Sequence, residues 1–292
     1  MPKSDMSIRK IMKRIIFTLI VCSLLGSIYA TNRALLIGIG KYKTGTQWSE
    51  IHGDADVDLL KPLLEKKGFK VTTLKNEEAT KQGIVAALNS LISECEKGDK
   101  VYFHFSGHGQ PMEDINGDED TFFDQTMVPY DDVIYYEEGE YEGENHFLDD
   151  EYSYYINSLR NKLGERGQLF IAIDACHSEG MERGDAVNCD TIVARGTDYT
   201  FKFNGKKPIR KFKVPVTLSL GAPTVIVSAC GKEEVNYEYR TSTGKMFGSL
   251  TYYMSYLMQS EINFDKWKNS FLFREYKRTK YFRRQNPTIQ EL

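Results

Sequence analysis

Short, wholly apolar runs alternate with amphipathic helical stretches along most of this chain, and that alternation limits the folds it can adopt. A strand that is apolar throughout must be covered on both faces, as in a mainly parallel sheet with helices on either side. We therefore expect an α/β fold whose site lies at the carboxyl ends of the strands. The expected strands lie at 33–40, 70–74, 99–105, 168–174 and 223–230, and the expected helices at 54–69, 79–97, 149–167 and 246–260.

The composition is that of an ordinary globular protein, and we expect one domain from about residue 31 to residue 292. The formal net charge of −3 gives no reason to expect nucleic acid or an anionic membrane as a partner. Two long inserts interrupt the alternation. Residues 110–147 are acidic and rich in tyrosine, whereas residues 181–222 are basic. Loops of this length in a compact domain are usually functional or disordered.

The N-terminal residues up to Ala30 have the layout of a secretory signal peptide. A basic start precedes an apolar run from Ile15 to Ile28, and cleavage is expected after Ala30. The alternative, a single membrane-spanning helix, requires a longer apolar run. We therefore expect an exported protein (periplasmic, at the cell surface or extracellular) with no stable membrane association after cleavage.

Two of the expected buried strands end in reactive side chains. One ends at Ser106 and is followed by His108 and Gly109, and the other ends at Asp174 and is followed by Cys176. If these strands are neighbours in a parallel sheet, the imidazole and the thiol emerge at the same edge. The imidazole can generate the nucleophilic thiolate and later protonate a leaving amine, and the Gly109 N–H can face a developing oxyanion. The competing interpretation is structural, because a lone buried cysteine is more often a core residue.

The runs YFHFSGHG and IDACHSEG resemble the two active-site motifs of the caspase-like cysteine peptidases of clan CD, the caspases and metacaspases. RALLIGIGKY and DADVDLLKPLLEKKGF are similar to the first strand and first helix of that family. By this resemblance the chain is identified as a bacterial metacaspase-type member with a three-layer α/β sandwich fold. It implies Cys176 as nucleophile, His108 as general acid and base, and the N–H groups of Gly109 and Cys176 as the oxyanion hole. One departure is Glu179, which interrupts the family's usual Cys-His-Ser-Gly.

The acidic residues near the thiol favour a basic substrate. A buried carboxylate without a partner is costly, so a substrate cation would complete a pair with Asp174. The resemblance supports this, because metacaspases carry aspartate at that position whereas aspartate-specific caspases carry glutamine, and the caspase arginine that binds aspartate would align near Glu50. Asp56 matches a second metacaspase pocket residue, and Asp54 would either support the pocket or cap a helix. We expect peptide or protein substrates with Arg or Lys at P1, the residue before the cleaved bond.

The acidic insert raises the hypothesis of a calcium site, although the catalytic chemistry itself requires no cofactor. Its alternating oxygen side chains resemble the start of a calcium loop, but the glycine and the closing glutamate of an EF-hand are missing. By the resemblance, some metacaspases need calcium. A solvated acidic loop is the alternative, and Asp149 would serve equally well as a helix N-cap. The candidate ligands are Asp114, Asp118, Asp120, Asp149 and Asp150.

The basic insert over 181–222 follows the nucleophile where caspases have their interdomain linker. It contains several basic residues, among them Arg183, Arg195 and Lys206. An enzyme that cuts after basic residues would find them in an exposed loop beside its own active site, and flexible segments are cleaved readily. Autoprocessing, or occupation of the active site by this loop until it is cut, is one hypothesis. A solvated loop that is never cleaved is the other.

The sequence thus predicts an exported cysteine endopeptidase that cleaves after Arg or Lys through a Cys176–His108 dyad. Two alternatives stay open at this point. One is a catalytically silent binding module that keeps the fold and the pocket. The other is a related peptidase of the gingipain or legumain type, with arginine or asparagine at P1.

Overall fold

The computed structural model describes residues 30–114, 123–176, 193–197, 199–203, 221–231, 234–282 and 285–292. Thr31–Leu292 form one compact unit. The expected signal peptide, apart from Ala30, lies outside the described residues, as do Asp118 and Asp120 of the calcium hypothesis. None of the helices in the described ranges has both the length and the apolar character that a bilayer crossing requires.

Strands and helices alternate along the chain in the way the apolar runs predict. Three short strands between residues 109 and 148, two more between residues 238 and 248, and the elements after residue 263 were not expected. Residues 246–248, which were expected to begin the last helix, form one of these strands, so that helix begins at Ser249. The strands are β1 (Asn32–Gly38), β2 (Lys70–Lys75), β3 (Lys100–Ser106), β4 (Gly109–Glu113), β5 (Phe123–Met127), β6 (Phe147–Leu148), β7 (Gln168–Asp174), β8 (Thr224–Ser228), β9 (Glu238–Arg240), β10 (Met246–Gly248) and β11 (Thr288–Glu291). The helices are α2 (Gly53–Lys66), α3 (Lys81–Glu94), α4 (Asp149–Leu163), α5 (Ser249–Met258) and α6 (Phe264–Leu272).

The main sheet has six strands in the order β11-β8-β7-β3-β1-β2. Its first five strands in sequence, β1, β2, β3, β7 and β8, pair in parallel, and β11 adds an antiparallel edge next to β8. The expected α/β fold with a mainly parallel sheet is therefore confirmed. The edge strand was not expected, because its sequence is short and mostly exposed and so carries no buried apolar run.

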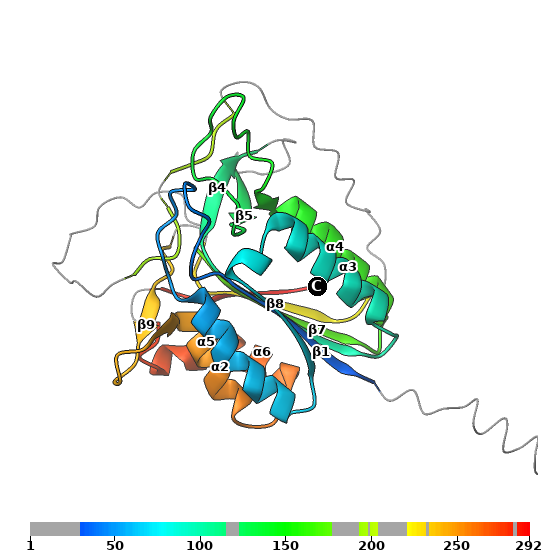
Figure 1. Cartoon of the computed structure of the whole chain (residues 1–292). Coiled ribbons are helices and arrows are strands. Elements are labelled where there is room, and N and C mark those ends of the chain that lie inside the picture. Colours follow the sequence, from blue (N-terminus) through cyan, green and yellow to red (C-terminus); the bar gives the residue numbers. More distant parts are fainter. Residues whose placement is uncertain are drawn as a thin grey trace, which may run out of the picture. The chain divides into compact units, whose positions relative to one another are not determined.

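Helices cover both faces of this sheet, with α3 and α4 on one side and α2, α5 and α6 on the other (Figure 1). Successive residues of β3 enter opposite cores, since side chains alternate along a strand. Phe103 and Phe105 pack with the first pair of helices, whereas Tyr102 packs on the other face against Trp267 of α6. This double coverage is the reason that these strands read as continuously apolar.

The described parts of both inserts contain structure that the sequence did not suggest. Part of the acidic insert forms a small antiparallel sheet of β4, β5 and β6 beside the main sheet (Figure 1). In the basic insert, Phe201 and Phe203 are fully buried and pack with Met112 of β4. The alternative of a solvated basic loop is therefore wrong for residues 193–197 and 199–203, because Phe201 and Phe203 anchor this part of the insert to the domain.

Candidate active site

The register of β3 and β7 brings the two sequence motifs together. Ser106, the last residue of β3, pairs with Asp174, the last residue of β7. The chain leaves both strands at the same edge, and the Gly107 N–H donates to the Asp174 carbonyl, 3.3 Å away. His108 and Cys176 each lie two residues past this pair and are both buried. The expected juxtaposition follows from parallel pairing without a register shift.

The His108 ring is oriented by the loop between β1 and α2. Its Nε2 lies 3.0 Å from the Ser49 carbonyl oxygen, which can only accept, so Nε2 carries the proton and Nδ1 keeps its lone pair. Nδ1 is buried and has no hydrogen-bond partner within the described ranges. Trp48 stacks on the ring at 5.0 Å, and the Tyr42 hydroxyl accepts from the His108 N–H at 2.7 Å. Burial lowers the pKa of His108 to about 4, so the imidazole is neutral at pH 7.

The backbone N–H and the thiol of Cys176 both donate to carbonyl oxygens of the chain. Its N–H donates to the Arg195 carbonyl oxygen at 2.8 Å, while its thiol donates to the Glu234 carbonyl at 3.5 Å. Gly196 forms a parallel bridge with Gly109, and a Cβ placed on Gly196 would lie 3.1 Å from Cys176 Sγ. The Arg195–Gly196 peptide bond therefore lies against the thiol, between the two segments that were expected to form an oxyanion hole.

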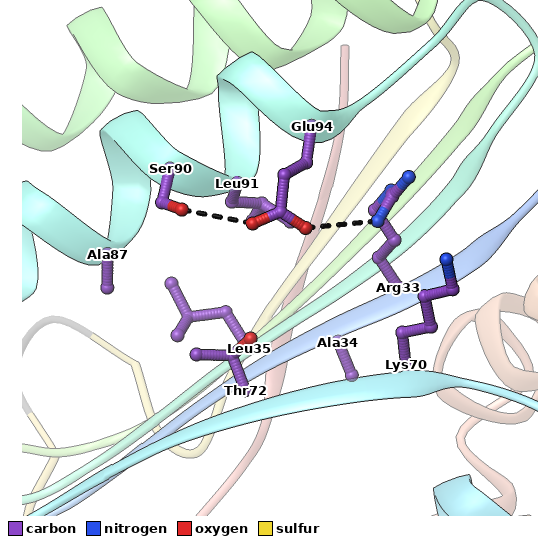
Figure 2. Close-up of a pocket in the computed structure, with 9 residues that line it drawn as sticks. All are labelled: Arg33, Ala34, Leu35, Lys70, Thr72, Ala87, Ser90, Leu91 and Glu94. Atoms are coloured by element: carbon purple, nitrogen blue, oxygen red, sulfur yellow. Dashed lines mark hydrogen bonds and ion pairs between the residues drawn. The ribbon is translucent and has the colours of Figure 1, made fainter.

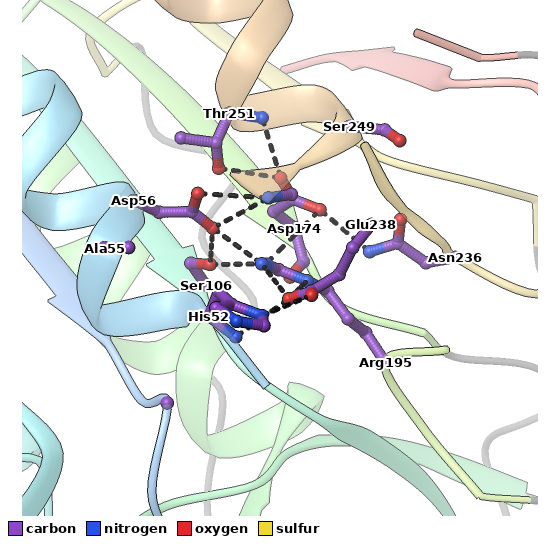
Figure 3. Close-up of polar contacts among 12 residues, drawn as sticks. His52, Ala55, Asp56, Ser106, Asp174, Arg195, Asn236, Glu238, Ser249 and Thr251 are labelled. Carbon is purple, nitrogen blue, oxygen red and sulfur yellow. Dashed lines mark hydrogen bonds and ion pairs between the residues drawn. The ribbon is translucent and has the colours of Figure 1, made fainter. Parts of the chain in front are cut away.

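The Arg195 side chain fills an acidic cluster at the same sheet edge (Figure 3). Its Nη2 lies 2.8 Å from Asp56 Oδ2 and 2.8 Å from Glu238 Oε1, and its Nη1 lies 3.7 Å from Asp174 Oδ1. Nη1 also donates to the Ser106 hydroxyl. All four charged side chains are fully buried. The two aspartates expected to bind a substrate cation thus surround a cation of the chain itself.

Further hydrogen bonds hold the two aspartates in place. Asp174 Oδ2 accepts from the N–H and the hydroxyl of Thr251, both at 2.7 Å, and Oδ1 accepts from Asn236 at 2.8 Å. Asp56 accepts from the Gly248 N–H at 3.0 Å and from the Ser106 hydroxyl at 2.6 Å. Gly248 and Thr251 lie at the start of α5, where unpaired N–H groups favour a carboxylate.

A line of hydrogen bonds runs from the core to Asp174. The Thr251 hydroxyl donates to Asp174, so it accepts from His104 Nε2 at 2.9 Å, and His104 Nδ1 accepts from the Tyr102 hydroxyl at 2.9 Å. Burial lowers the pKa of His104 to about 4, which keeps the ring neutral in this line. His104 therefore orients Asp174 through Thr251 and does not itself reach the site.

The buried charges depend on one another. Burial raises the pKa of Asp56 to about 7, although Arg195 opposes this change. Burial would lower the pKa of Arg195, but Asp56, Asp174 and Glu238 together raise it above its usual value. Without the guanidinium of Arg195, three carboxylates would be buried together with no opposing charge. The cluster therefore depends on a cation at this position.

A comparison with protein-family models matches residues 31–290 to the caspase domain. The chain belongs to the caspase domain family. Metacaspase-3 of Arabidopsis thaliana is 29% identical over 239 residues, and metacaspase-2 of the same plant is 31% identical over 163 residues. The matches cover 78% and 52% of this chain but only 59% and 35% of those relatives, so the caspase-family chain spans part of their length.

Solved structures share the caspase fold. The structure of caspase-1 from Spodoptera frugiperda has a TM-score of 0.51 at 13% identity and covers 89% of this chain and 86% of that one. Protein GSU0716 from Geobacter sulfurreducens has a TM-score of 0.63 at 18% identity and covers 89% and 93%. The resemblance to the caspase-like peptidases, carried by the two motifs, is thereby confirmed at the level of family and fold.

Asp54, unlike Asp56, is not brought to the acidic cluster of this caspase domain. Its carboxylate accepts from the Ala55 N–H at 2.9 Å and from Asn76 at 3.2 Å. It is also not the N-cap of α2, a position that His52 occupies. Because Asp54 and Asp56 are two residues apart on a helix, their side chains point in different directions, and only Asp56 faces the cluster.

The described residues hold no group of three or more acidic, His or Cys side chains placed to bind a metal ion. Asp149 and Asp150 lie in the first turn of α4, whose N-cap is Leu148, so the expected N-cap role of Asp149 is displaced by one residue. Asp114 is buried and is the last described residue before the gap at 115–122 in the acidic insert. The calcium hypothesis stays a prediction, because Asp118 and Asp120 lie outside the described residues.

The sequence did not identify Glu238 as a site residue. It lies at the start of β9, far along the chain from both motifs, and only the tertiary fold brings it to Arg195. Arg195 was expected as one of several exposed basic residues, but it is fully buried. That expectation failed because a basic residue opposite three carboxylates is more stable inside the cluster than in solvent.

A separate pocket lies at the opposite ends of the strands (Figure 2). Arg33, the second residue of β1, and Lys70, the first residue of β2, line it together with Glu94 of α3. Arg33 and Glu94 form an ion pair across it at 3.2 Å. It lies at the amino ends of the strands, whereas the candidate active site lies at the carboxyl ends and is filled by Arg195.

Proposed function

We propose that this chain is a cysteine endopeptidase that cleaves after Arg or Lys, with Cys176 as nucleophile and His108 as general base and acid. One observation carries the proposal: Arg195 lies in the site as a P1 residue would. Its guanidinium is bound by Asp56 and Glu238, and its carbonyl oxygen accepts from the Cys176 N–H. A basic side chain and a peptide carbonyl are held in the relation that hydrolysis requires.

The backbone around Arg195 supports the same interpretation. The Arg195 N–H donates to the Asn236 carbonyl at 2.9 Å, and the Glu238 N–H donates to the Val193 carbonyl at 2.9 Å. Ala194 forms an antiparallel bridge with Tyr237. Extended peptides are commonly recognised by such strand addition, in which main-chain bonds supply affinity and pockets read the side chains. Residues 193–195 therefore correspond to P3, P2 and P1 of a peptide substrate.

The chemistry that we propose begins with transfer of the thiol proton to His108 Nδ1, the nitrogen with the lone pair. Cys176 Sγ then attacks the P1 carbonyl carbon, whose oxygen takes the electron pair beside the Cys176 N–H. The carbon–nitrogen bond breaks, and the leaving amine takes the proton from His108. Water hydrolyses the resulting thioester and releases a carboxylate. Gly109, which forms a bridge with Gly196, supplies the second oxyanion donor in this proposal.

The same arrangement supports autoprocessing at the Arg195–Gly196 bond. Cleavage there would create a new C-terminus at Arg195 and a new N-terminus at Gly196. Arg195 fills the acidic cluster until the bond is cut, so substrates have no access before its departure. The cut thus converts an occupied site into an open one, which makes autoprocessing an activation step.

Two related expectations belong to this proposal. Export rests on the layout of residues 1–30, and N-terminal sequencing of the secreted protein tests it, with cleavage after Ala30 as the expected result. Calcium dependence rests on the acidic insert. Activity assays with calcium and with a chelator test it, and equal rates in both would remove calcium from the account.

The proposal is tested by hydrolysis of short fluorogenic peptides that end in Arg, Lys, Asp or Asn. We expect turnover of the Arg and Lys peptides by wild-type protein under reducing conditions, and none by Cys176→Ala or His108→Ala. Turnover of Asn peptides instead would identify a legumain-type specificity. A wild-type protein that turns over none of them, also after deliberate cleavage of the basic insert, would be a silent binding module.

A further inference from the structure

We infer that Glu238 makes the P1 pocket select arginine over lysine, and that His52 holds Glu238 in position. This inference rests on the proposed function, since it concerns the pocket of that same site. It adds a residue that neither motif contains. The contacts of Arg195 stand for those of a bound P1 arginine.

Glu238 binds the part of the guanidinium that is peculiar to arginine. Its Oε1 accepts from Arg195 Nε at 3.2 Å and from Nη2 at 2.8 Å (Figure 3). Asp56 accepts from Nη2, and the carboxylate of Asp174 lies 3.7 Å from Nη1 with its oxygens bound by Thr251 and Asn236. Within the described ranges, Glu238 is the one carboxylate with a hydrogen bond to Nε.

A lysine in the same pocket would present different atoms to Glu238. Counted from the Cα atom, the lysine Cε methylene stands where arginine has Nε, and Nζ stands where arginine has Cζ. Glu238 Oε1 would therefore face a methylene in place of an N–H donor, while Asp56 and Ser106 could still accept from the ammonium. Oε1 would keep the His52 N–H but lose its two guanidinium donors, and the loss of charged donors at a buried carboxylate discriminates against the ligand that lacks them. Glu238 thus discriminates between the two cations, whereas Asp56 serves both.

His52 and the backbone of β9 hold Glu238 in place. Glu238 Oε2 lies 2.6 Å from His52 Nδ1, and Oε1 accepts from the His52 N–H at 2.8 Å. The Glu238 side chain is fully buried, whereas that of His52 is 45% exposed. The Glu238 N–H also donates to the Val193 carbonyl, at the P3 position. One residue therefore reads the P1 side chain and the P3 backbone, and His52 is its positioning residue.

The test compares kcat/KM for matched Arg and Lys peptides, with active sites counted by an irreversible thiol-directed inhibitor. Wild type is expected to prefer Arg. Glu238→Ala should lower kcat/KM for the Arg peptide by about 10- to 100-fold, the range expected for a lost charged hydrogen bond, and should change that for the Lys peptide much less. The Arg-to-Lys ratio should therefore fall at least about tenfold. Glu261→Gln, an exposed change away from the site, is the matched control.

His52→Gln should lower the same ratio through a higher KM for the Arg peptide, with kcat little changed. An equal loss for both peptides would mean that His52 acts on folding alone and would overturn its positioning role. If Glu238→Ala fails to fold, Arg195→Lys in the intact chain tests the same preference, since it should slow cleavage of the bond after residue 195 by about tenfold or more.

The outcomes distinguish a failure of this inference from a failure of the proposed peptidase function. An Arg-to-Lys ratio that is the same in wild type and Glu238→Ala, with both peptides cleaved, overturns the role of Glu238 and leaves the basic specificity intact. Wild type that cleaves neither peptide overturns the proposed function, and the inference with it. A ratio that falls only in the Glu238 and His52 variants supports the inference.

Discussion

The amide N–H of Cys176 lies 2.8 Å from the carbonyl oxygen of Arg195, whose own side chain occupies the acidic cluster behind the thiol. A side chain that served only to neutralise buried carboxylates would not need its carbonyl on the expected nucleophile. A P1 residue needs both contacts at once. The predictions below follow from this double contact and from the burial around it.

Removal of the Arg195 charge should destabilise the uncut protein. Arg195→Gln would leave Asp56, Asp174 and Glu238 buried without their cation, a change that typically costs about 3–5 kcal/mol. The comparison belongs on the Cys176→Ala background, where no cleavage intervenes, and is read from urea unfolding at pH 7. Arg240→Gln, at an exposed arginine, should change stability little. Equal effects of the two changes would contradict the account.

Binding of Arg substrates should depend on pH through Asp56. Burial raises the pKa of Asp56 to about 7 with the guanidinium in place, and a cation prefers the ionised carboxylate. Without the guanidinium, which lowers it, the pKa of Asp56 lies higher still, so binding at or above about pH 7 expels a proton and KM for Arg peptides should fall as the pH rises from about 7 to 8. Asp56→Asn should raise KM and flatten this dependence. A wild-type KM that rises over the same range would contradict the assigned ionisation.

The buried His104 should make the fold sensitive to acid. Burial lowers its pKa from 6.5 to about 4, so the unfolded chain binds the proton at a higher pH than the native chain does. The stability from keeping the ring neutral is therefore present above pH 6.5 and is lost as the pH falls from 6.5 towards 4, to a limit of about 3 kcal/mol. His104→Gln removes the titrating imidazole, so the unfolding free energy of this variant should fall less steeply than that of wild type between pH 6.5 and 4.5. Parallel slopes in urea unfolding would refute this.

Trp48 should act on catalysis through the orientation of His108. It stacks on the imidazole, whose Nε2 donates to the Ser49 carbonyl in the adjacent loop. Trp48→Ala should allow the ring to rotate, and we expect kcat to fall by about tenfold or more with KM nearly unchanged. Trp48→Phe keeps an aromatic face and should recover most of the rate. A change confined to KM would place Trp48 in the substrate pocket instead.

The sequence predicts the layers of the fold well, because the apolar runs reflect burial on two faces. Val57, Leu60 and Leu64 share one face of the expected first helix, and all three are buried against the sheet. The same logic places His108 and Cys176 at one edge, since parallel strands in register end together. These features depend on local pattern and on one general rule of sheet geometry.

The contents of the site depend on contacts that no local pattern encodes. Glu238 reaches Arg195 from a short strand after β8, and the basic insert returns to the sheet edge after residues that lie outside the described ranges. From charge alone, Arg195 was expected to be exposed to solvent, because basic inserts are usually solvated. Its burial follows from complementarity with three carboxylates, of which the sequence motifs revealed two.

The central claim is that Arg195 lies in the site as a substrate, and the most direct test is the mass and N-terminal sequence of the fragments in purified wild-type protein. The account predicts two fragments, one of which ends at Arg195 and the other of which begins at Gly196. Cys176→Ala and Arg195→Gln should both remain intact at this bond. A wild-type chain that stays whole under reducing conditions, or one that is cut elsewhere and equally in Arg195→Gln, would contradict the claim.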